Sequence, residues 1–166
     1  MAAMIEYESY PMLGIAEALK AAGNKIFQFT GRSRRSEYWW TFLVVFLANF
    51  VLTPFGAFAL SLLTIPLTFR RLHDTGLSGW WWGGLALLKV VLFVVFVYDA
   101  LRLSLYPVAA GFDDTGIIVF LLGKYILLVV LVVVYKIVLI VMLCIDSDPE
   151  PNRYGVSPKY GAEAEV

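Results

Sequence analysis

The one histidine of the chain, His73, stands beside Asp74, and this pair is the clearest candidate for acid–base chemistry. A histidine base needs a carboxylate that orients its ring and a pocket that holds a substrate. Residues adjacent in sequence rarely orient each other in this way, and a metal site would need further ligands from scattered Asp and Glu residues. The single cysteine, Cys144, excludes an internal disulfide and a cysteine-based zinc site. We therefore predict no catalytic, cofactor-binding or metal site, and we expect a protein that is not an enzyme.

The composition places these residues in a membrane protein. Apolar residues make up 60% of the 166 residues and charged residues only 16%, whereas a soluble domain carries about 25% charged residues. So few charges cannot coat a compact globule. Thirteen basic and thirteen acidic residues give a net charge of zero, which argues against a nucleic-acid partner recognised by bulk charge.

Three apolar stretches are candidates for membrane helices. Residues 38–69 carry no charged side chain and would measure roughly 48 Å as one helix, against a bilayer core of about 30 Å. Pro54 and Gly56 lie near the midpoint of this stretch, where a helical hairpin would need a break. The other two stretches are residues 80–98, interrupted by Lys89, and residues 117–145, interrupted by Lys124 and Lys136.

The distribution of Lys and Arg favours two spans in the first stretch, because cytoplasmic flanks collect basic residues. Two spans divide the flanking basic residues nine against one, while one span divides them six against four. The nine are Lys20, Lys25, Arg32, Arg34, Arg35, Arg70, Arg71, Arg153 and Lys159, against Arg102. We predict an all-α integral membrane four-helix bundle of two helical hairpins, with both termini cytoplasmic and helices near 37–54, 55–72, 79–98 and 117–145.

The remaining segments complete the expected organisation. Residues 1–28 would form a cytoplasmic N-terminal segment with a short interfacial helix within 13–22, and residues 29–158 the membrane domain. The loop near 99–116 would face outward. Residues 159–166 would form a polar C-terminal tail.

Three sequence blocks stand at the expected cytoplasmic helix ends: FTGRSRRSEYWW at 29–40, RRLHDTGLSGWW at 70–81, and NRYG at 152–155, followed by Pro158. In this order they resemble the domain of unknown function 805 family of small bacterial inner-membrane proteins. The resemblance covers roughly residues 18–158 and implies four helices in the bacterial inner (plasma) membrane, with no biochemical activity assigned. The chain departs from the family in a more acidic turn at 146–151 and a longer outer loop around 102–114.

The three blocks supply the candidate site residues. Arginines directly before an aromatic belt are typical of a topology anchor, and the alternative is recognition of an anionic lipid headgroup or a cytoplasmic anion. Glu37 is a candidate partner for Arg34 or Arg71. A second hypothesis is a buried polar clasp that joins Arg71, Asp74, Glu37 and Arg153. The full candidate set is Arg32, Arg34, Arg35, Glu37, Arg70, Arg71, His73, Asp74, Asn152, Arg153 and Tyr154.

Lysines inside the apolar stretches form a second candidate site. A charge at mid-membrane depth is costly and indicates function by default, which applies to Lys89 and Lys136; snorkelling is the alternative for Lys89. Lys124, near the outer helix end, is expected to snorkel outward. We find no acidic residue within the expected spans to complete a proton or cation relay.

The sequence therefore predicts an uncharacterised, non-enzymatic inner-membrane protein whose basic cytoplasmic face engages anionic lipid or a partner protein. The candidate protein partners are a second copy of the chain or another membrane protein. The alternative is a small transporter or channel subunit that uses Lys89 and Lys136, which in a four-helix chain would require oligomerisation.

Overall fold

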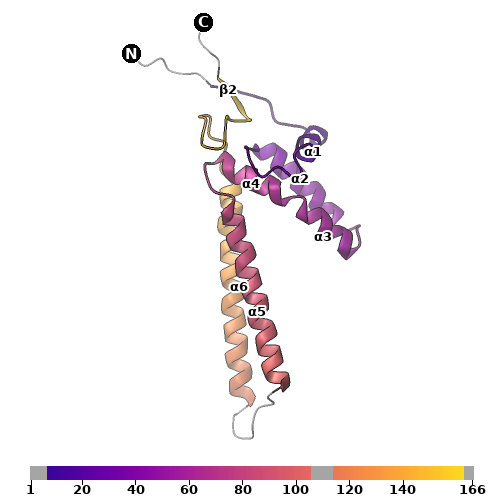
Figure 1. Cartoon of the computed structure of the whole chain (residues 1–166), viewed down its shortest axis with the longest axis vertical. Helices are drawn as coiled ribbons and strands as arrows, with labels where there is room; N and C mark the ends of the chain where they lie inside the picture. The colour runs from indigo at the N-terminus through magenta and orange to yellow at the C-terminus, as the bar shows by residue number, and fades with distance from the viewer. Residues whose placement is uncertain (1–6, 106–113, 163–166) are drawn as a thin grey trace, which may run out of the picture. The chain divides into compact units, whose positions relative to one another are not determined.

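The computed structural model describes residues 7–105 and 114–162, and it is mainly helical (Figure 1). The elements in chain order are β1 (Tyr7–Ser9), α1 (Ile15–Gly23), α2 (Arg35–Ala48), α3 (Pro54–Leu62), α4 (Ile65–Asp74), α5 (Trp80–Leu105), α6 (Asp114–Cys144) and β2 (Tyr160–Ala162). The chain divides into two compact units, residues 1–81 with 141–166 and residues 82–140. The first unit thus contains both segments that the sequence analysis set apart, 1–28 and 159–166.

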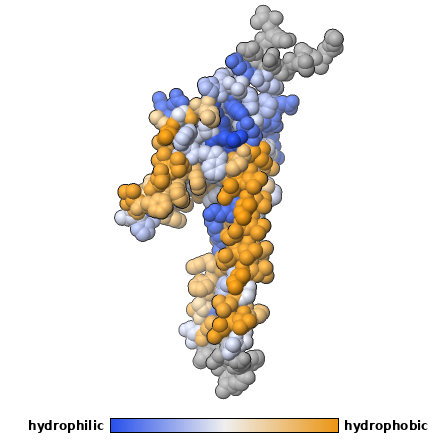
Figure 2. Space-filling view, turned by 180° about the vertical axis from the view of Figure 1, so that it is seen from behind, coloured by the Kyte–Doolittle hydropathy of each residue, from blue (hydrophilic) through white to orange (hydrophobic). Residues whose placement is uncertain are grey.

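Three segments of the described chain are long and apolar enough to cross a membrane: Pro54–Asp74, Trp80–Ser104 and Thr115–Cys144. Hydrophobic residues cover most of the visible surface of α5 and α6, while hydrophilic residues gather in the first unit (Figure 2). These features fit a membrane protein. The four-helix bundle and the cytoplasmic termini remain predictions.

The predicted first span, 37–54, is corrected by the structure. Its helix, α2, has 14 residues and measures about 21 Å, less than the bilayer core of about 30 Å. The helix ends at Ala48 because Asn49 caps it: the side-chain amide of Asn49 donates to the Val45 carbonyl at 2.6 Å. Thr53 then caps α3 by accepting from the Gly56 N–H, with Pro54 in the first turn. The break expected near Pro54 and Gly56 is therefore present.

The predicted second span, 55–72, is two helices rather than one. α3 ends at Leu62 and α4 begins at Ile65, with Pro66 in the first turn of α4. Proline has no N–H to donate and its ring clashes with the carbonyl four residues earlier, which here belongs to Leu62. The sequence analysis did not use Pro66, and this residue explains the interruption.

An aromatic ladder runs along α2. Tyr38 stacks with Phe42 at a centroid separation of 6.1 Å, Phe42 with Phe46 at 6.3 Å, and Phe46 meets Phe50 edge-on at 5.2 Å. Residues four apart lie on one face of a helix. Because Phe42, Phe46 and Phe50 are exposed, this face of α2 suits a lipid surrounding.

The second unit is a helical hairpin in which α5 and α6 run side by side (Figure 1). α5 is longer than predicted and reaches Leu105, so the start of the expected outer loop, 99–116, is helical; residues 106–113 of that loop lie outside the described residues. The two helices approach closely at Gly84, where an added side chain would overlap Tyr135 of α6.

The longer α5 also corrects the expectation that no acidic residue lies within a span. Asp99 lies inside the candidate span Trp80–Ser104. It forms an ion pair with Lys124 and accepts a hydrogen bond from the Tyr125 hydroxyl at 2.5 Å. Lys124 therefore pairs with α5 rather than simply snorkelling outward.

The termini of the first unit are joined by a short sheet. β1 and β2 pair antiparallel, with Tyr7 opposite Ala162 and Ser9 opposite Tyr160. The beginning of the predicted polar tail is thus part of a strand; residues 163–166 lie outside the described residues. α1 contacts α2 and occupies nearly the positions of the short helix expected within 13–22.

Candidate site: a buried arginine–aspartate clasp

The candidate site is built on α4, the helix that carries the second sequence block. α4 ends in a Schellman motif: Gly76 N–H donates to the His73 carbonyl at 3.0 Å and Leu77 N–H to the Leu72 carbonyl at 3.0 Å. Gly76 adopts a positive φ of 74°, which glycine takes without steric cost. This ending fixes the last turn of α4, where Arg70, Arg71 and Asp74 are fully or almost fully buried.

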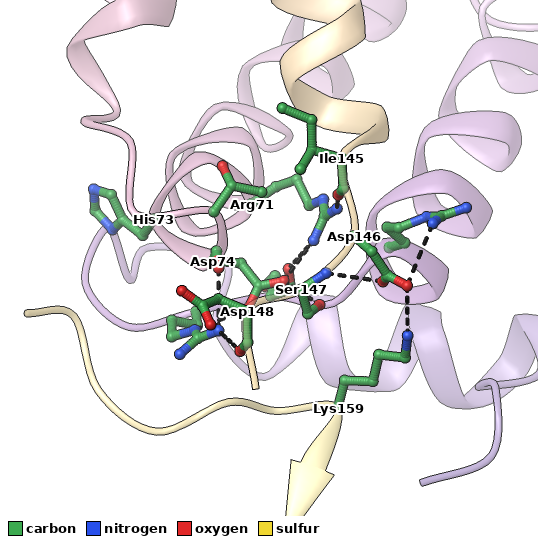
Figure 3. A network of polar contacts seen from close by, with 12 residues as sticks. Arg71, His73, Asp74, Ile145, Asp146, Ser147, Asp148 and Lys159 are labelled. Atoms are coloured by element: carbon green, nitrogen blue, oxygen red, sulfur yellow. Dashed lines mark hydrogen bonds and ion pairs between the residues drawn. The ribbon is translucent and has the colours of Figure 1, made fainter. Parts of the chain in front are cut away.

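Asp74 is the centre of the site. Its Oδ1 accepts from Arg32 Nε at 2.8 Å, and its Oδ2 accepts from both Arg71 Nη1 and the Ser147 hydroxyl. The Asp74 side chain has no exposed surface. We name this cluster of Arg32, Arg71, Asp74 and Ser147 the clasp (Figure 3).

Arg32 connects the first block to the third. Besides the Asp74 carboxylate, its guanidinium donates to the Asp74 carbonyl at 3.1 Å, to the Asp148 carbonyl at 2.5 Å and to the Glu150 carbonyl at 2.8 Å. It also donates to the Gly155 carbonyl at 3.3 Å. A guanidinium has five N–H donors, and these five contacts bind the acidic turn 146–151 to α4.

Arg71 caps α6 from a different helix. Its Nε donates to the Leu143 carbonyl at 3.1 Å and its Nη2 to the Ile145 carbonyl. The carbonyls at a helix C-terminus lack partners within the helix and carry partial negative charge, so a cation is stabilising there. Arg71 thus fixes the end of the last helix to the clasp.

Arg70 forms a second cluster beside the clasp. It pairs with Glu37 at 3.2 Å and donates to the Ser33 hydroxyl at 3.0 Å. It also donates to the Gln28 carbonyl at 3.0 Å and to the Lys25 carbonyl. The partner of Glu37 is therefore Arg70, not Arg34 or Arg71 as expected from the sequence.

His73 has a structural environment. Its Nδ1 lies 3.2 Å from the Gly31 carbonyl, which only accepts, so Nδ1 carries the proton in this contact. The ring stacks on Tyr154 at a centroid separation of 3.7 Å and is turned away from the Asp74 carboxylate (Figure 3). The His73 carbonyl accepts from the Asn152 amide at 2.9 Å.

The third block closes over α4 as a tight turn. Asn152 and Gly155 exchange two backbone hydrogen bonds of 3.1 and 2.9 Å, and Gly155 has a φ of 124°. Arg153 is exposed; it lies over the Tyr154 ring at 4.7 Å and reaches the Gly76 carbonyl at 3.4 Å. The structure therefore does not bring Arg153 to Asp74, whereas Arg71 and Asp74 do meet.

Arg34 and Arg35 lie outside the clasp. With Lys159 and Asp146 they line a pocket of about 240 Å³, which we name the basic pocket. Asp146 is 2.6 Å from Lys159 and 3.6 Å from Arg35. Three cations and one carboxylate thus line the basic pocket, and two of the cations, Arg35 and Lys159, contact the carboxylate.

The candidate lysines Lys89 and Lys136 belong to the second unit. Lys89 lines a surface hollow of about 330 Å³ together with Phe93, Phe96 and Tyr125. Lys89 and Lys136 are exposed, and no hydrogen bond or ion pair joins either ammonium to another described residue. A hydrophilic patch interrupts the apolar surface of the hairpin (Figure 2).

Three residues of these contacts are absent from the candidates that the sequence supplied: Ser147 of the clasp, Ser33 beside Arg70, and Asp99 of the hairpin ion pair. Ser33, whose hydroxyl and carbonyl accept from Arg70 and Arg71, stands inside the first block, so the block itself was the available signal. Ser147 lies in the acidic turn, where nothing in the sequence marks it. Asp99 was assigned to a loop because the expected third helix ended too early. Within the described residues, no group of three His, Cys, Asp or Glu residues could hold a metal ion.

Comparison with known proteins identifies a family. A family model described as "Protein of unknown function (DUF805)" matches residues 26–63 and 54–156. The matched range contains all three sequence blocks that meet around α4. No curated protein and no solved structure matches the chain.

The clasp generates a first prediction. Asp74→Asn should lower the free energy of unfolding by about 3–5 kcal/mol, because two guanidiniums stay buried without their carboxylate. Asp148→Asn, which alters an exposed carboxylate, should change it by less than about 0.5 kcal/mol. The measurement is thermal or denaturant unfolding of the full chain in detergent micelles.

A double-mutant cycle separates the contacts of Asp74. Arg32→Gln with Asp74→Asn should show a coupling above about 1 kcal/mol, whereas Arg153→Gln with Asp74→Asn should be additive within about 0.5 kcal/mol. Equal coupling to both arginines would contradict the clasp.

The exposed pair Asp146–Lys159 generates a pH prediction. Burial raises the pKa of Asp146, but hydrogen bonds from Lys159 and the Ser147 N–H outweigh burial, so the pKa lies below its ordinary value. The hydrogen bond to Asp146 is the main cause that raises the pKa of Lys159. The pair should therefore contribute a constant stabilisation, at most about 1 kcal/mol, between about pH 4 and pH 10, which are near the ordinary pKa values of the two groups.

The contribution of this pair should disappear at both ends of that range. It is lost when the pH falls through the lowered pKa of Asp146 and when it rises through the raised pKa of Lys159. The measurement is the difference in free energy of unfolding between the native chain and Asp146→Asn as a function of pH. A difference that stays constant below pH 3 would show that the carboxylate contributes nothing.

Proposed function

The chain belongs to the DUF805 family of proteins of unknown function, and from this premise we propose that it is a non-enzymatic protein of the bacterial inner membrane that binds anionic lipid headgroups at its basic pocket. Lipid is favoured over a partner protein as the ligand. The observation that carries the proposal is the gathering of Arg34, Arg35 and Lys159 around one pocket of about 240 Å³ with a single carboxylate, Asp146.

The buried arginines of the clasp and of the Arg70 cluster support the proposal, because they are not available to bind lipid. The side chains of Arg32, Arg70 and Arg71 are at most 1% exposed, and their N–H groups are bound to carboxylates, hydroxyls and backbone carbonyls of the chain. They are therefore structural, although the sequence analysis counted them as candidate headgroup contacts. The basic residues left for lipid are those outside the clasp.

The non-enzymatic part of the proposal rests on the same geometry. A general base must be available to accept a proton. The Asp74 carboxylate is held by two guanidiniums and a hydroxyl, and the His73 ring is covered by Tyr154. Neither group is placed to act on a substrate.

The position of the basic pocket suits a membrane surface. Arg34 is the N-cap of α2 and Arg35 is its first residue. The aromatic ladder of α2 suits lipid, and the positive-inside rule favours the cytoplasmic leaflet for this end of the helix. That leaflet attracts basic residues by about 1 kcal/mol per Lys or Arg near the surface. A phosphate can be bound there by guanidinium groups through charge-assisted hydrogen bonds.

The test is native mass spectrometry of the full chain released from phosphatidylcholine nanodiscs that contain phosphatidylglycerol. Arg34→Gln/Arg35→Gln should lose about 2 kcal/mol of phosphatidylglycerol affinity, roughly thirtyfold. The matched control Lys20→Gln/Arg102→Gln removes two charges that do not line the pocket. An equal loss in both double variants would overturn the site. If Arg34→Gln/Arg35→Gln leaves lipid binding unchanged but no longer cross-links to a protein that the native chain cross-links, the ligand of the basic pocket is a partner protein.

A second candidate function is transport by an oligomer through the α5–α6 hairpin. It is favoured by Lys89 and Lys136, which are exposed on a largely apolar hairpin. A lysine at membrane depth is costly unless it faces water, a counter-charge or another subunit. Chloride efflux from liposomes containing the native chain should be abolished by Lys89→Leu and retained by Lys89→Arg. Absence of efflux from the native chain would dismiss this function.

A further inference from the structure

An apolar cavity of about 180 Å³ lies in the first unit among α1, α2 and the α3–α4 segment. An apolar cavity of about 150 Å³ is large enough to hold benzene, so this one can admit a short length of hydrocarbon chain. It shares no lining residue with the basic pocket. Its apolar lining includes Leu19, Ile26, Val44, Val45, Leu60 and Leu63.

The cavity has a polar end and an apolar end. Glu37 on α2 is bonded to Arg70 on α4, and Thr41 follows Glu37 by about one helical turn. Thr41 and Arg70 therefore line the same end of the cavity. Val45 lies a further turn along α2, away from Arg70. Thr64 also lines the cavity, but its hydroxyl donates to the Ser61 carbonyl at 2.7 Å, so the end away from Arg70 offers mainly apolar side chains. This gradient matches an amphiphile that has a hydrocarbon tail.

Thr41 and Lys25 have unused polar groups at this cavity. Thr41 is 8% exposed, and its hydroxyl is buried without a hydrogen-bond partner among the described residues. Leaving a buried hydroxyl unpaired is unfavourable, and buried polar atoms in native proteins nearly always have a partner. Lys25, a residue of the cavity lining, is exposed, and within the described part of the chain its ammonium has no ion pair.

The guanidinium of Arg70, which also lines the cavity, is not available to bind a ligand. Arg70 is already bonded to Glu37, Ser33 and two backbone carbonyls. A ligand that enters the cavity would therefore find one cation, at Lys25, and one hydroxyl, at Thr41. Together they can bind one anionic group and one hydrogen-bond acceptor.

We propose that this cavity binds part of one acyl chain of an anionic phospholipid, with the headgroup phosphate at Lys25 and an ester carbonyl that accepts a hydrogen bond from the Thr41 hydroxyl. The phospholipid is favoured over a free fatty acid because it supplies an anion and a separate carbonyl acceptor, whereas the carboxylate of a fatty acid is a single group. The lipid is at hand, since the segment Pro54–Asp74 is a candidate membrane span. This site is independent of the basic pocket and does not rest on the function proposed for it.

The experiment uses the full chain in phosphatidylcholine nanodiscs that contain phosphatidylglycerol with a photoactivatable diazirine on one acyl chain. After irradiation, the labelled residues are mapped by peptide mass spectrometry. We expect labels on residues that line the cavity, such as Val44 and Leu60. Labels confined to outward residues of α2, such as Phe46, would overturn the proposal.

Variants identify each part of the site. Val45→Trp fills the cavity and should abolish the label inside it, whereas Leu47→Trp, at a residue 55% exposed outside the cavity, should retain it. Thr41→Val and Lys25→Gln should each reduce the label about fivefold, the equivalent of one hydrogen bond or one surface cation. Lys20→Gln, an exposed lysine of α1 that does not line the cavity, should leave it unchanged.

Two further arms make the result specific. Unlabelled phosphatidylglycerol should compete for the label and palmitate should not; competition by palmitate alone would overturn the phospholipid assignment. Arg34→Gln/Arg35→Gln should leave the label in place, so that failure of the basic pocket and failure of this cavity are distinguished. Far-UV circular dichroism and size exclusion verify that each variant folds, and a Val45→Trp variant that folds yet keeps the internal label would also overturn the proposal.

Discussion

The buried carboxylate of Asp74, held between Arg32 and Arg71, is the interaction on which the first unit depends. One guanidinium belongs to the segment before α2 and the other to α4. Through their remaining N–H groups they bind the backbone of the turn after α6 and the last carbonyls of α6 itself. A single charged residue thus fixes segments that are more than 70 positions apart in the sequence.

A polar clasp is a reasonable solution for helices that leave a membrane. Helices in lipid have no hydrophobic drive to associate, because the lipid tails are as apolar as their side chains. Specific hydrogen bonds and close packing must hold them together instead. Burying three arginines is expensive, and the desolvation is offset only because backbone carbonyls complete the guanidinium hydrogen bonds. The structure meets this condition most fully at Arg32, for which five acceptors are present.

The sequence allowed the family, the apolar helices and the polar character of the α4 end to be predicted, and the reasons are physical. Hydropathy located α5 and α6 because apolar length is a property of the chain alone. It overestimated α2, because the carbonyl of Val45 is capped by Asn49, and it missed the break at Pro66. The sequence could not show that Glu37 pairs with Arg70, because the choice among neighbouring arginines depends on the rotation of the helices about their axes. Every residue has a backbone carbonyl, so no residue type could show that Arg32 donates to the carbonyls of Asp148 and Glu150.

The basic residues of the first unit have one expected role during insertion and different surroundings after folding. The positive-inside rule acts while the chain is inserted, before any clasp exists, so all nine flanking basic residues count toward the expected orientation. After folding, Arg32, Arg70 and Arg71 are enclosed and neutralised by the chain's own acceptors. The other six of the nine remain outside these two clusters. Arginines of the same short sequence therefore differ in their surroundings: Arg32 is buried in the clasp, while Arg34 and Arg35 line the basic pocket.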